Sequence, residues 1–204
     1  MNKVLVAGEV VAVDDTTVKI LTIAHTPNRT FENEYTVHFD DGTPDLMVGE
    51  RQQILGRFDK DLDNPNAIRI VGIESRDYGS QLDMNIARVS GIVSQSLIAW
   101  DPIAEEKKRA FSEILLIVEG SFYVRGAVLR APAVVKLERS GKILQGAEVQ
   151  MEGRLNTRNF ESNGVKQERL EMVLDTPKTL VLKEAPSDPF EAFNEESTNV
   201  ASAI

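Results

Sequence analysis

Two arginines and a phenylalanine alternate near the end of the segment GAEVQMEGRLNTRNF, residues 146–160. In an extended strand, alternate side chains point to opposite faces, so Arg154, Arg158 and Phe160 share one face and Leu155 lies on the other. A guanidinium group pairs with phosphate oxygens, and flat side chains stack on unpaired bases. The spacing therefore predicts a surface suited to the backbone and the bases of a single nucleic-acid strand.

Other cations and rings extend this candidate surface. In the segment SFYVRGAV, Tyr123 and Arg125 have the parity opposite to Phe122 and Val124, so we expect the first two on the binding face and Phe122 in the core. Trp100 has two interpretations, a base-stacking residue or a ring that closes one end of the fold. The remaining candidates for contact with a strand are Arg130, Lys166 and Arg169.

Each of these side chains also has a purely structural interpretation. Arg154 and Arg158 could form ordinary cross-strand ion pairs, and pairs of that kind contribute little to stability. Phe160 could cover one end of the fold. The carboxylates available for such pairs are Glu152, Glu168 and Glu171.

Composition excludes several kinds of site. The 204 residues include no cysteine and two histidines, which rules out disulfides, thiolate nucleophiles and histidine-rich metal clusters. Asp59, Asp61 and Asp63 imitate the start of a calcium loop, but Asn64 and Ile70 stand where that loop requires glycine and glutamate. Paired carboxylates elsewhere lack an accompanying nucleophile or base. We therefore expect no enzyme, no metal and no cofactor.

Charge is distributed unevenly along the chain, whose formal net charge is −9. Residues 1–83 hold 8 Lys and Arg against 15 Asp and Glu, or −7, whereas residues 84–183 hold 15 against 12, or +3. Residues 184–204 hold five carboxylates and no Lys or Arg, or −5. Only the middle segment is basic, as a phosphate-binding segment should be.

Hydropathy favours a cytoplasmic protein without a membrane partner. The first ten residues, MNKVLVAGEV, contain an apolar run too short for a secretory signal. No segment reaches the roughly 18 uninterrupted apolar residues of a membrane span.

Two segments recur in the same order. MNKVLVAGEV at residue 1 and MNIARVSGIV at residue 84 share Met, Asn, Val, Gly and Val at identical spacing. GERQQILGRF at residue 49 and GAEVQMEGRL at residue 146 share a glycine followed by a Gly-Arg pair. These matches predict an internal duplication.

Five alternating runs follow one another in each copy. The expected strands are 3–13, 17–25, 34–40, 50–58 and 67–74, and then 86–99, 111–119, 121–130, 147–158 and 165–174. Five strands with a short helix, here at 131–144, are typical of a Greek-key barrel of the oligonucleotide-binding (OB) type. We therefore predict an all-β chain of two tandem five-stranded OB barrels, with a disordered acidic tail. The predicted boundaries are 1–76 and 84–183 for the barrels, 77–83 for a linker and 184–204 for the tail.

The second copy resembles the bacterial single-stranded DNA-binding protein family over about residues 84–175. MNIARVSGIV resembles the family's first strand, YVRGAVLRAPA its third, and GAEVQMEGRLNTRNFESNGVKQERLEMVL its fourth strand, hairpin and fifth strand. The resemblance implies non-enzymatic binding of single-stranded DNA by the face that carries Arg154, Arg158 and Phe160. Family members usually display several tryptophans, whereas this chain has one.

The family's acidic tail ends in a Pro-Phe tip that docks onto replication and repair proteins. Here the corresponding Pro-Phe pair lies inside the segment SDPFEAF, and the chain continues to Ile204. The resemblance implies that replication or recombination proteins bind the tail through Asp188, Pro189, Phe190 and Phe193.

Three functions remain open at this point. One is a single-stranded DNA-binding protein of replication, recombination or repair, for which a phage or a mobile element is one compatible source. The second is an OB-fold scaffold that binds mainly protein and has little affinity for DNA, and the third is an accessory OB subunit of a nucleic-acid enzyme. The net charge favours the scaffold, whereas the basic segment and the arginine-aromatic strand favour DNA. The choice between DNA and RNA and the formation of a homo-oligomer also stay open.

Overall fold

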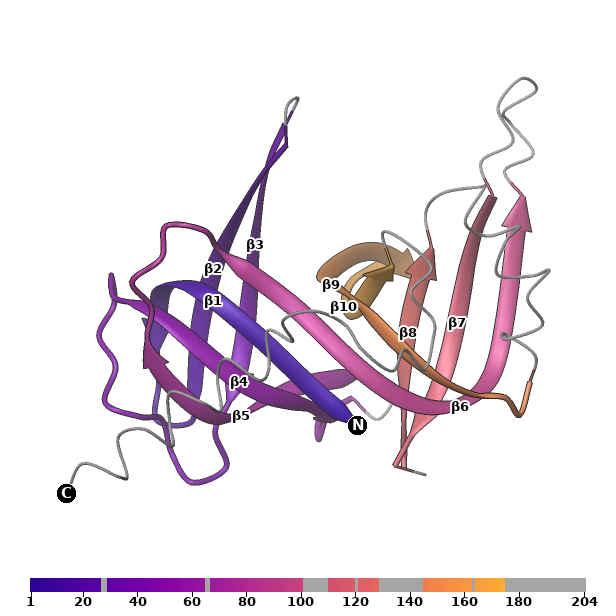
Figure 1. Cartoon of the computed structure of the whole chain (residues 1–204), viewed down its shortest axis with the longest axis horizontal. Helices are drawn as coiled ribbons and strands as arrows, with labels where there is room; N and C mark the ends of the chain where they lie inside the picture. The colour runs from indigo at the N-terminus through magenta and orange to yellow at the C-terminus, as the bar shows by residue number, and fades with distance from the viewer. Residues whose placement is uncertain are drawn as a thin grey trace.

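The computed structural model describes residues 1–26, 29–64, 67–100, 110–119, 121–128, 145–162 and 164–174. These residues form ten β-strands and no helix, so the predicted all-β fold is confirmed (Figure 1). No described segment is therefore a helix able to cross a membrane. The predicted helix at 131–144 and the tail at 184–204 lie outside the described residues.

Each half of the chain contributes five strands. The first half forms β1 (Asn2–Val13), β2 (Thr17–Thr26), β3 (Arg29–His38), β4 (Arg51–Lys60) and β5 (Ile68–Asp77). The second half forms β6 (Met84–Trp100), β7 (Ala110–Val118), β8 (Phe122–Val128), β9 (Glu148–Ser162) and β10 (Val165–Leu174).

The two sets of strands close into barrels with the same order. In the N-terminal barrel, β1 pairs with β2 and β4, β2 pairs with β3, and β4 pairs with β5, all antiparallel. The parallel pair of β3 and β5 completes the barrel. Strands β6 to β10 repeat this arrangement in the C-terminal barrel, including the parallel pair of β8 and β10. The prediction of two five-stranded Greek-key OB barrels is confirmed.

Gly8 and Gly91, the glycines shared by the two opening segments, are required for the same structural reason in both barrels. A Cβ atom on Gly8 would lie 2.1 Å from the carbonyl oxygen of Leu21, and one on Gly91 would lie 2.4 Å from that of Ile117. Any side chain would therefore collide with the backbone of the next strand. Because both barrels need this close approach, both copies have glycine here.

The glycine of the shared Gly-Arg pair behaves in the same way. Cβ atoms on Gly56 and Gly153 would each lie 2.5 Å from a carbonyl oxygen, that of Val71 in β5 and that of Val173 in β10. The two contacts are equivalent, so they align β4 with β9 and β5 with β10.

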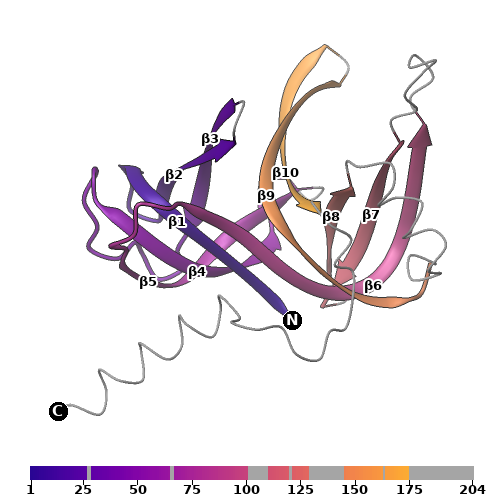
Figure 2. The same ribbon diagram turned by 45° about the horizontal axis from the view of Figure 1, so that its top comes forward.

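The barrels are joined through their first strands. β1 and β6 pair antiparallel from Asn2 opposite Val89 to Ala7 opposite Met84. Strands β4, β1, β6 and β9 therefore run side by side as one sheet that continues from one barrel into the other (Figure 2). A single hydrophobic cluster contains buried residues of both halves. The barrels are consequently packed as one body.

A buried tyrosine reinforces this junction. The Tyr35 hydroxyl of β3 donates to the Leu155 carbonyl of β9 at 2.9 Å and accepts from Asn85 Nδ2 of β6 at 2.9 Å. Burial raises the pKa of Tyr35 to about 12, so the hydroxyl keeps the proton that it donates. This bond therefore persists at any physiological pH.

The segment predicted as a linker, 77–83, is bonded to the N-terminal barrel. Tyr78 donates its backbone N–H to the Arg51 carbonyl at 2.9 Å, and Arg51 Nε donates to the Ser80 carbonyl at 3.0 Å. The Asp83 carboxylate pairs with Arg51 and accepts the backbone N–H of Ile23 at 2.6 Å. These contacts hold the connection against the first barrel.

The strands that extend furthest beyond their predicted limits are β3, by five residues at its start, and β9, by four at its end. β3 begins at Arg29 because its ladder with β2 continues as far as Thr26 opposite Arg29. β9 continues to Ser162, which lies opposite Val165 of β10. These hairpin arms bury too little of either face to show the apolar alternation by which strands are predicted.

Candidate nucleic-acid interface

The outward side chains of β7, β8, β10 and β9 form one surface, here called the arginine face. Its members are Glu113, Tyr123, Arg125, Arg154, Arg158, Phe160 and Arg169, with the buried Glu171 beneath Arg169. The alternation of burial along β8 shows that Tyr123 and Arg125 point outward. Phe122 and Val124 are buried in the core, whereas Tyr123 between them is 54% exposed and Arg125 is half-buried.

One carboxylate gathers cations from three strands. Glu113 of β7 pairs with Arg125 of β8, with Arg158 of β9 at 3.3 Å and with Arg169 of β10 at 3.5 Å. The Glu113 side chain is only 14% exposed. Its negative charge therefore holds three guanidinium groups together that would otherwise repel one another.

The cluster keeps an excess of positive charge. Arg169 makes a second ion pair with Glu171 at 3.2 Å, and Glu171 also accepts from Asn156 at 3.2 Å. Three arginines thus face two glutamates. Each guanidinium has five N–H donors, so donors remain for a further anion beside these contacts.

An aromatic ring adjoins the cations. The Arg169 guanidinium lies over the Phe160 ring at 5.3 Å from its centroid, a cation–π contact. Arg154 is exposed on the same strand as Phe160, opposite Val173 of β10 and Ile86 of β6. Flat groups and positive charge therefore occur side by side on this face.

The structure brings several of the predicted residues together, and the others lie outside the described part of the chain. Tyr123, Arg125, Arg158, Phe160 and Arg169 lie on neighbouring strands of the arginine face. Trp100 and Lys166 belong to β6 and β10, but their side chains are outside the described part of the chain. The other predicted residues that lie outside the described ranges are Arg130, Asp188, Pro189, Phe190 and Phe193.

The sequence did not single out Glu113, and the expected ion-pair partners differ. Arg158 contacts Glu113, 45 residues away, rather than a glutamate of its own hairpin. Glu152, one of the expected partners, instead accepts from Arg88 Nε at 2.8 Å. One signal was present: Glu113 shares its outward parity with Leu115 and is the charged residue of that stripe.

Two adjoining hollows lie between the barrels, and Ala67, Ile68 and Leu170 line both of them. The hollow that we call the junction pocket is lined in addition by apolar residues of the C-terminal barrel and by two arginines. Its further lining residues are Leu115, Phe122, Tyr123, Arg125 and Arg169.

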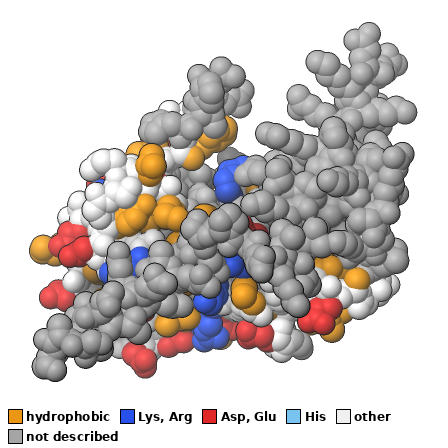
Figure 3. All heavy atoms as spheres, in the orientation of Figure 1, with side chains coloured by type: hydrophobic (Ala, Val, Ile, Leu, Met, Phe, Trp, Pro, Cys, Tyr) orange, Lys and Arg blue, Asp and Glu red, His pale blue; other side chains and the backbone are white. Residues whose placement is uncertain are grey.

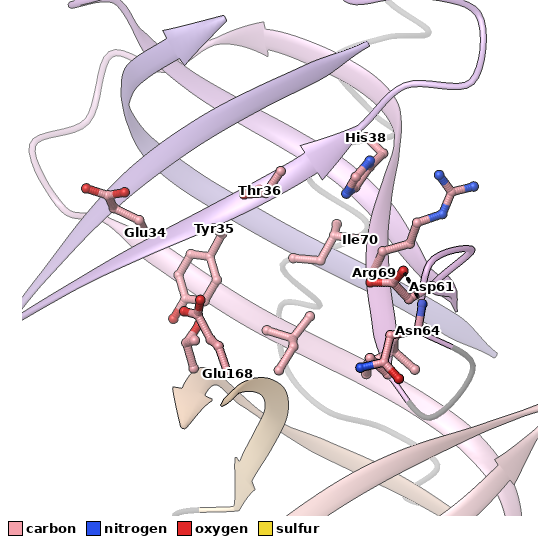
Figure 4. A pocket seen from close by; sticks show the side chains of 13 residues that line it. Glu34, Tyr35, Thr36, His38, Asp61, Asn64, Arg69, Ile70 and Glu168 are labelled. Atoms are coloured by element: carbon pink, nitrogen blue, oxygen red, sulfur yellow. Dashed lines mark hydrogen bonds between the residues drawn. The ribbon is translucent and has the colours of Figure 1, made fainter. Parts of the chain in front are cut away.

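The second hollow has a different character (Figure 4). Carboxylates enter it from both barrels, Glu34 and Asp61 from the first and Glu168 from the second. His38 and Arg69 also line it, and burial followed by the nearby Arg69 charge lowers the pKa of His38. The two hollows together form a crevice between the barrels, which is cationic at the junction pocket and largely acidic at the second hollow.

The three aspartates of the first barrel's β4–β5 hairpin serve its turn and its ion pairs. Asp61 Oδ1 accepts the backbone N–H groups of Asp63 at 2.9 Å and Asn64 at 3.1 Å. Asp59 pairs with Arg57 at 3.5 Å. Within the described ranges, no group of three Asp, Glu or His side chains could hold a metal ion. Acidic and basic side chains also lie side by side elsewhere on the surface: Figure 3 shows acidic side chains on both sides of a basic patch along the lower edge of the view.

Comparison with known proteins gives a result at the level of fold. No protein-family model matches the chain, and no curated protein matches its sequence. Among solved structures, the wild-type single-stranded DNA-binding protein of Thermus aquaticus matches with a TM-score of 0.67 and 13% identity, covering 93% of this chain and 98% of that one. A mutant of the Thermus protein with a deletion and an arginine-to-alanine change matches with a TM-score of 0.65 and 14% identity, covering 92% and 98%. The tandem-barrel fold is therefore shared along nearly the whole of both chains.

Proposed function

We propose that this protein is a non-enzymatic single-stranded DNA-binding protein, and that residues 84–183 bind the strand across the arginine face. The observation that carries the proposal is the meeting of Arg125, Arg158 and Arg169 from three strands beside the ring of Phe160. A single strand offers phosphates to cations and unpaired bases to flat side chains, whatever its sequence.

Glu113 suits such a site because it orders the guanidinium groups before the strand arrives. Its two oxygens contact three arginines and leave most of their N–H donors available to phosphate. Ordering the long side chains in advance reduces the conformational entropy that binding would otherwise remove. The remaining positive charge then favours association with a polyanion.

The fold likeness supports the proposal by analogy. Proteins named as single-stranded DNA-binding proteins share the tandem barrels. We propose, by this analogy, that the chain acts in DNA replication, recombination or repair. RNA is a second substrate class compatible with the same chemistry, since phosphates and bases are common to both.

Fluorescence anisotropy of a labelled oligo-dT at several salt concentrations tests the proposal. Binding should weaken linearly on a log-log scale, with a slope of about −0.7 per phosphate neutralised. Arg158→Ala should weaken binding and flatten the slope by about one such contact. Absence of binding by the unaltered protein at low salt would reject a DNA-binding function.

A scaffold that binds mainly protein is the second candidate. Two observations favour it: Glu113 and Glu171 already neutralise part of the arginine cluster, and residues 1–83 carry a formal charge of −7. The scaffold predicts little oligo-dT binding at physiological salt, and no further loss in Arg158→Ala.

We further propose that residues 184–204 recruit replication or recombination proteins and compete with DNA for the arginine face. Five carboxylates without a compensating Lys or Arg form a tethered anion, whose effective concentration near that face is high. Deletion of 184–204 should tighten oligo-dT binding at low salt, and the gain should shrink as salt rises.

The partner role of the tail has a separate test. Phe190→Ala should weaken partner binding without changing DNA affinity. Unchanged results in both experiments would remove both tail roles.

A further inference from the structure

The junction pocket combines apolar walls with cations at one side. Ile68 of the N-terminal barrel and Leu115, Phe122 and Leu170 of the C-terminal barrel supply the apolar surface. Ala67 leaves its part of the wall open because its side chain is a single methyl group. A flat ring could lie against these side chains and withdraw its faces from water.

Arg169 adds a polar group that lacks an internal partner. Its Nε atom is buried, and it donates no hydrogen bond to any residue in the described part of the chain. A buried donor without an acceptor costs free energy, so its presence points to a ligand atom that accepts the bond. The carbonyl oxygens of thymine, cytosine and guanine are acceptors of this kind.

We propose that the junction pocket receives one unpaired base of the strand bound on the arginine face. Resting on the proposed function, this inference adds a subsite to which both barrels contribute. The base lies against the apolar walls, and its carbonyl oxygen accepts from Arg169 Nε. Its phosphate remains outside the pocket, near Arg125.

The second, acidic hollow limits the path that the strand can take over the surface. Its carboxylates, Glu34, Asp61 and Glu168, oppose the entry of phosphates at that end of the crevice. The strand therefore enters the junction pocket with a single base and continues across Arg158 and Phe160, instead of following the crevice.

Filling the pocket tests the proposal. Ala67→Trp should occupy the space of the base and weaken oligo-dT binding about 5- to 150-fold, the range for loss of one stacked base. Ile73→Trp, at an exposed position of β5, the strand that follows Ala67, is the matched control and should leave affinity unchanged. Circular dichroism should show the same β-spectrum for both variants. Leu115→Trp, which fills the pocket from the opposite barrel, should repeat the loss if Ala67→Trp fails to fold.

A 2-aminopurine scan gives a second readout. Placed at each position of a short oligo-dT in turn, the fluorescent base should show one position with a distinct signal, and Ala67→Trp should abolish that signal. A single abasic position there should weaken binding to the unaltered protein but add no loss in Ala67→Trp.

The outcomes separate the subsite from the function on which it rests. If Ala67→Trp and Leu115→Trp bind like the unaltered protein while Arg158→Ala does not, the pocket is not a base site and DNA binding stands. If the unaltered protein does not bind oligo-dT, both proposals fail.

Discussion

The two barrels share one fold but differ in charge at equivalent positions of their outward faces. The strand registers, aligned on Gly56 and Gly153, identify these positions. The aligned pairs are Tyr123 with Glu34, Arg125 with Thr36, Arg158 with Asp61 and Arg169 with Ala67. The N-terminal barrel thus has acidic or neutral side chains where the C-terminal barrel has a ring and three cations.

The glycines that the barrels have in common belong to the architecture. Gly56 and Gly153 permit the same close strand approach, and Arg57 and Arg154 follow them at equivalent positions. Arg57 contacts Asp40 at 3.9 Å and Asp59 at 3.5 Å. The Gly-Arg pair is thus a feature of both barrels, and the other outward positions are where the chemistry diverges.

Accessibility differs as well. Glu34 and Asp61 of the N-terminal barrel line the hollow that Glu168 of β10 also enters, so the second barrel partly covers the equivalent face of the first (Figure 4). The C-terminal barrel's face keeps Arg158 and the ring of Tyr123 exposed.

The largest effect should come from giving the second barrel the side chains of the first. The double change Arg158→Asp and Arg169→Ala reproduces the Asp61 and Ala67 pair and should weaken oligo-dT binding by about 100-fold, because two phosphate contacts are lost and a repulsive charge is added. The log-log salt slope should fall by about 1.4. Anisotropy titrations measure both. Arg57→Ala is the control, and an equal loss in that variant would remove the distinction between the barrels.

Substitution of the shared glycines should affect both barrels alike. Gly8→Ala and Gly91→Ala each place a Cβ atom against a backbone carbonyl oxygen and should lower the free energy of unfolding by about 3 kcal/mol, at the upper end for overpacking. Urea denaturation measures the loss. Gly79→Ala, where no atom lies within 4 Å of the added Cβ, should be nearly neutral. A large loss in one barrel alone would contradict their structural equivalence at this contact.

A smaller effect should distinguish the aromatic residues of the barrels. Phe160→Ala should weaken oligo-dT binding by about 1.5 kcal/mol, the scale of one base–aromatic stack, with little change in the salt slope. Phe31→Ala removes a ring that is 44% exposed in the N-terminal barrel and should leave affinity unchanged. Equal losses in the same titrations would mean that the strand also crosses the first barrel.

The smallest effect concerns pH and should arise in the N-terminal barrel. Because the folded state lowers the pKa of His38 below its ordinary value of 6.5, the unfolded chain binds the proton first as the pH falls. Stability should therefore be constant above about pH 6.5 and decline between that value and the lower folded pKa. His38 is partly exposed, so the loss should stay below about 1 kcal/mol.

His38→Gln should remove this decline when urea unfolding is compared at pH 7.5 and 5.5. The C-terminal barrel has Ala127 at the equivalent position and contributes no such titration. An identical decline in His38→Gln would assign the pH dependence to another group.

Local patterns in the sequence were enough to predict the strands, the two barrels and the outward parity of Tyr123 and Arg125. Apolar alternation reports which side of a strand is buried, and turn residues report where it ends, because both depend on neighbours in the chain. The repeated glycines marked equivalent points of the two barrels for a similar reason: each permits a contact that the fold itself requires.

Only tertiary structure decided which charges meet and where the barrels touch. Glu113 reaches Arg158 across 45 residues, and Tyr35 bonds to Leu155 across 120. The pairing of β1 with β6, which joins the barrels, likewise links residues that are 77 positions apart at Ala7 and Met84 and 87 apart at Asn2 and Val89. Such contacts depend on strand register and on the packing of distant surfaces, and neither property leaves a periodic trace in the order of residues.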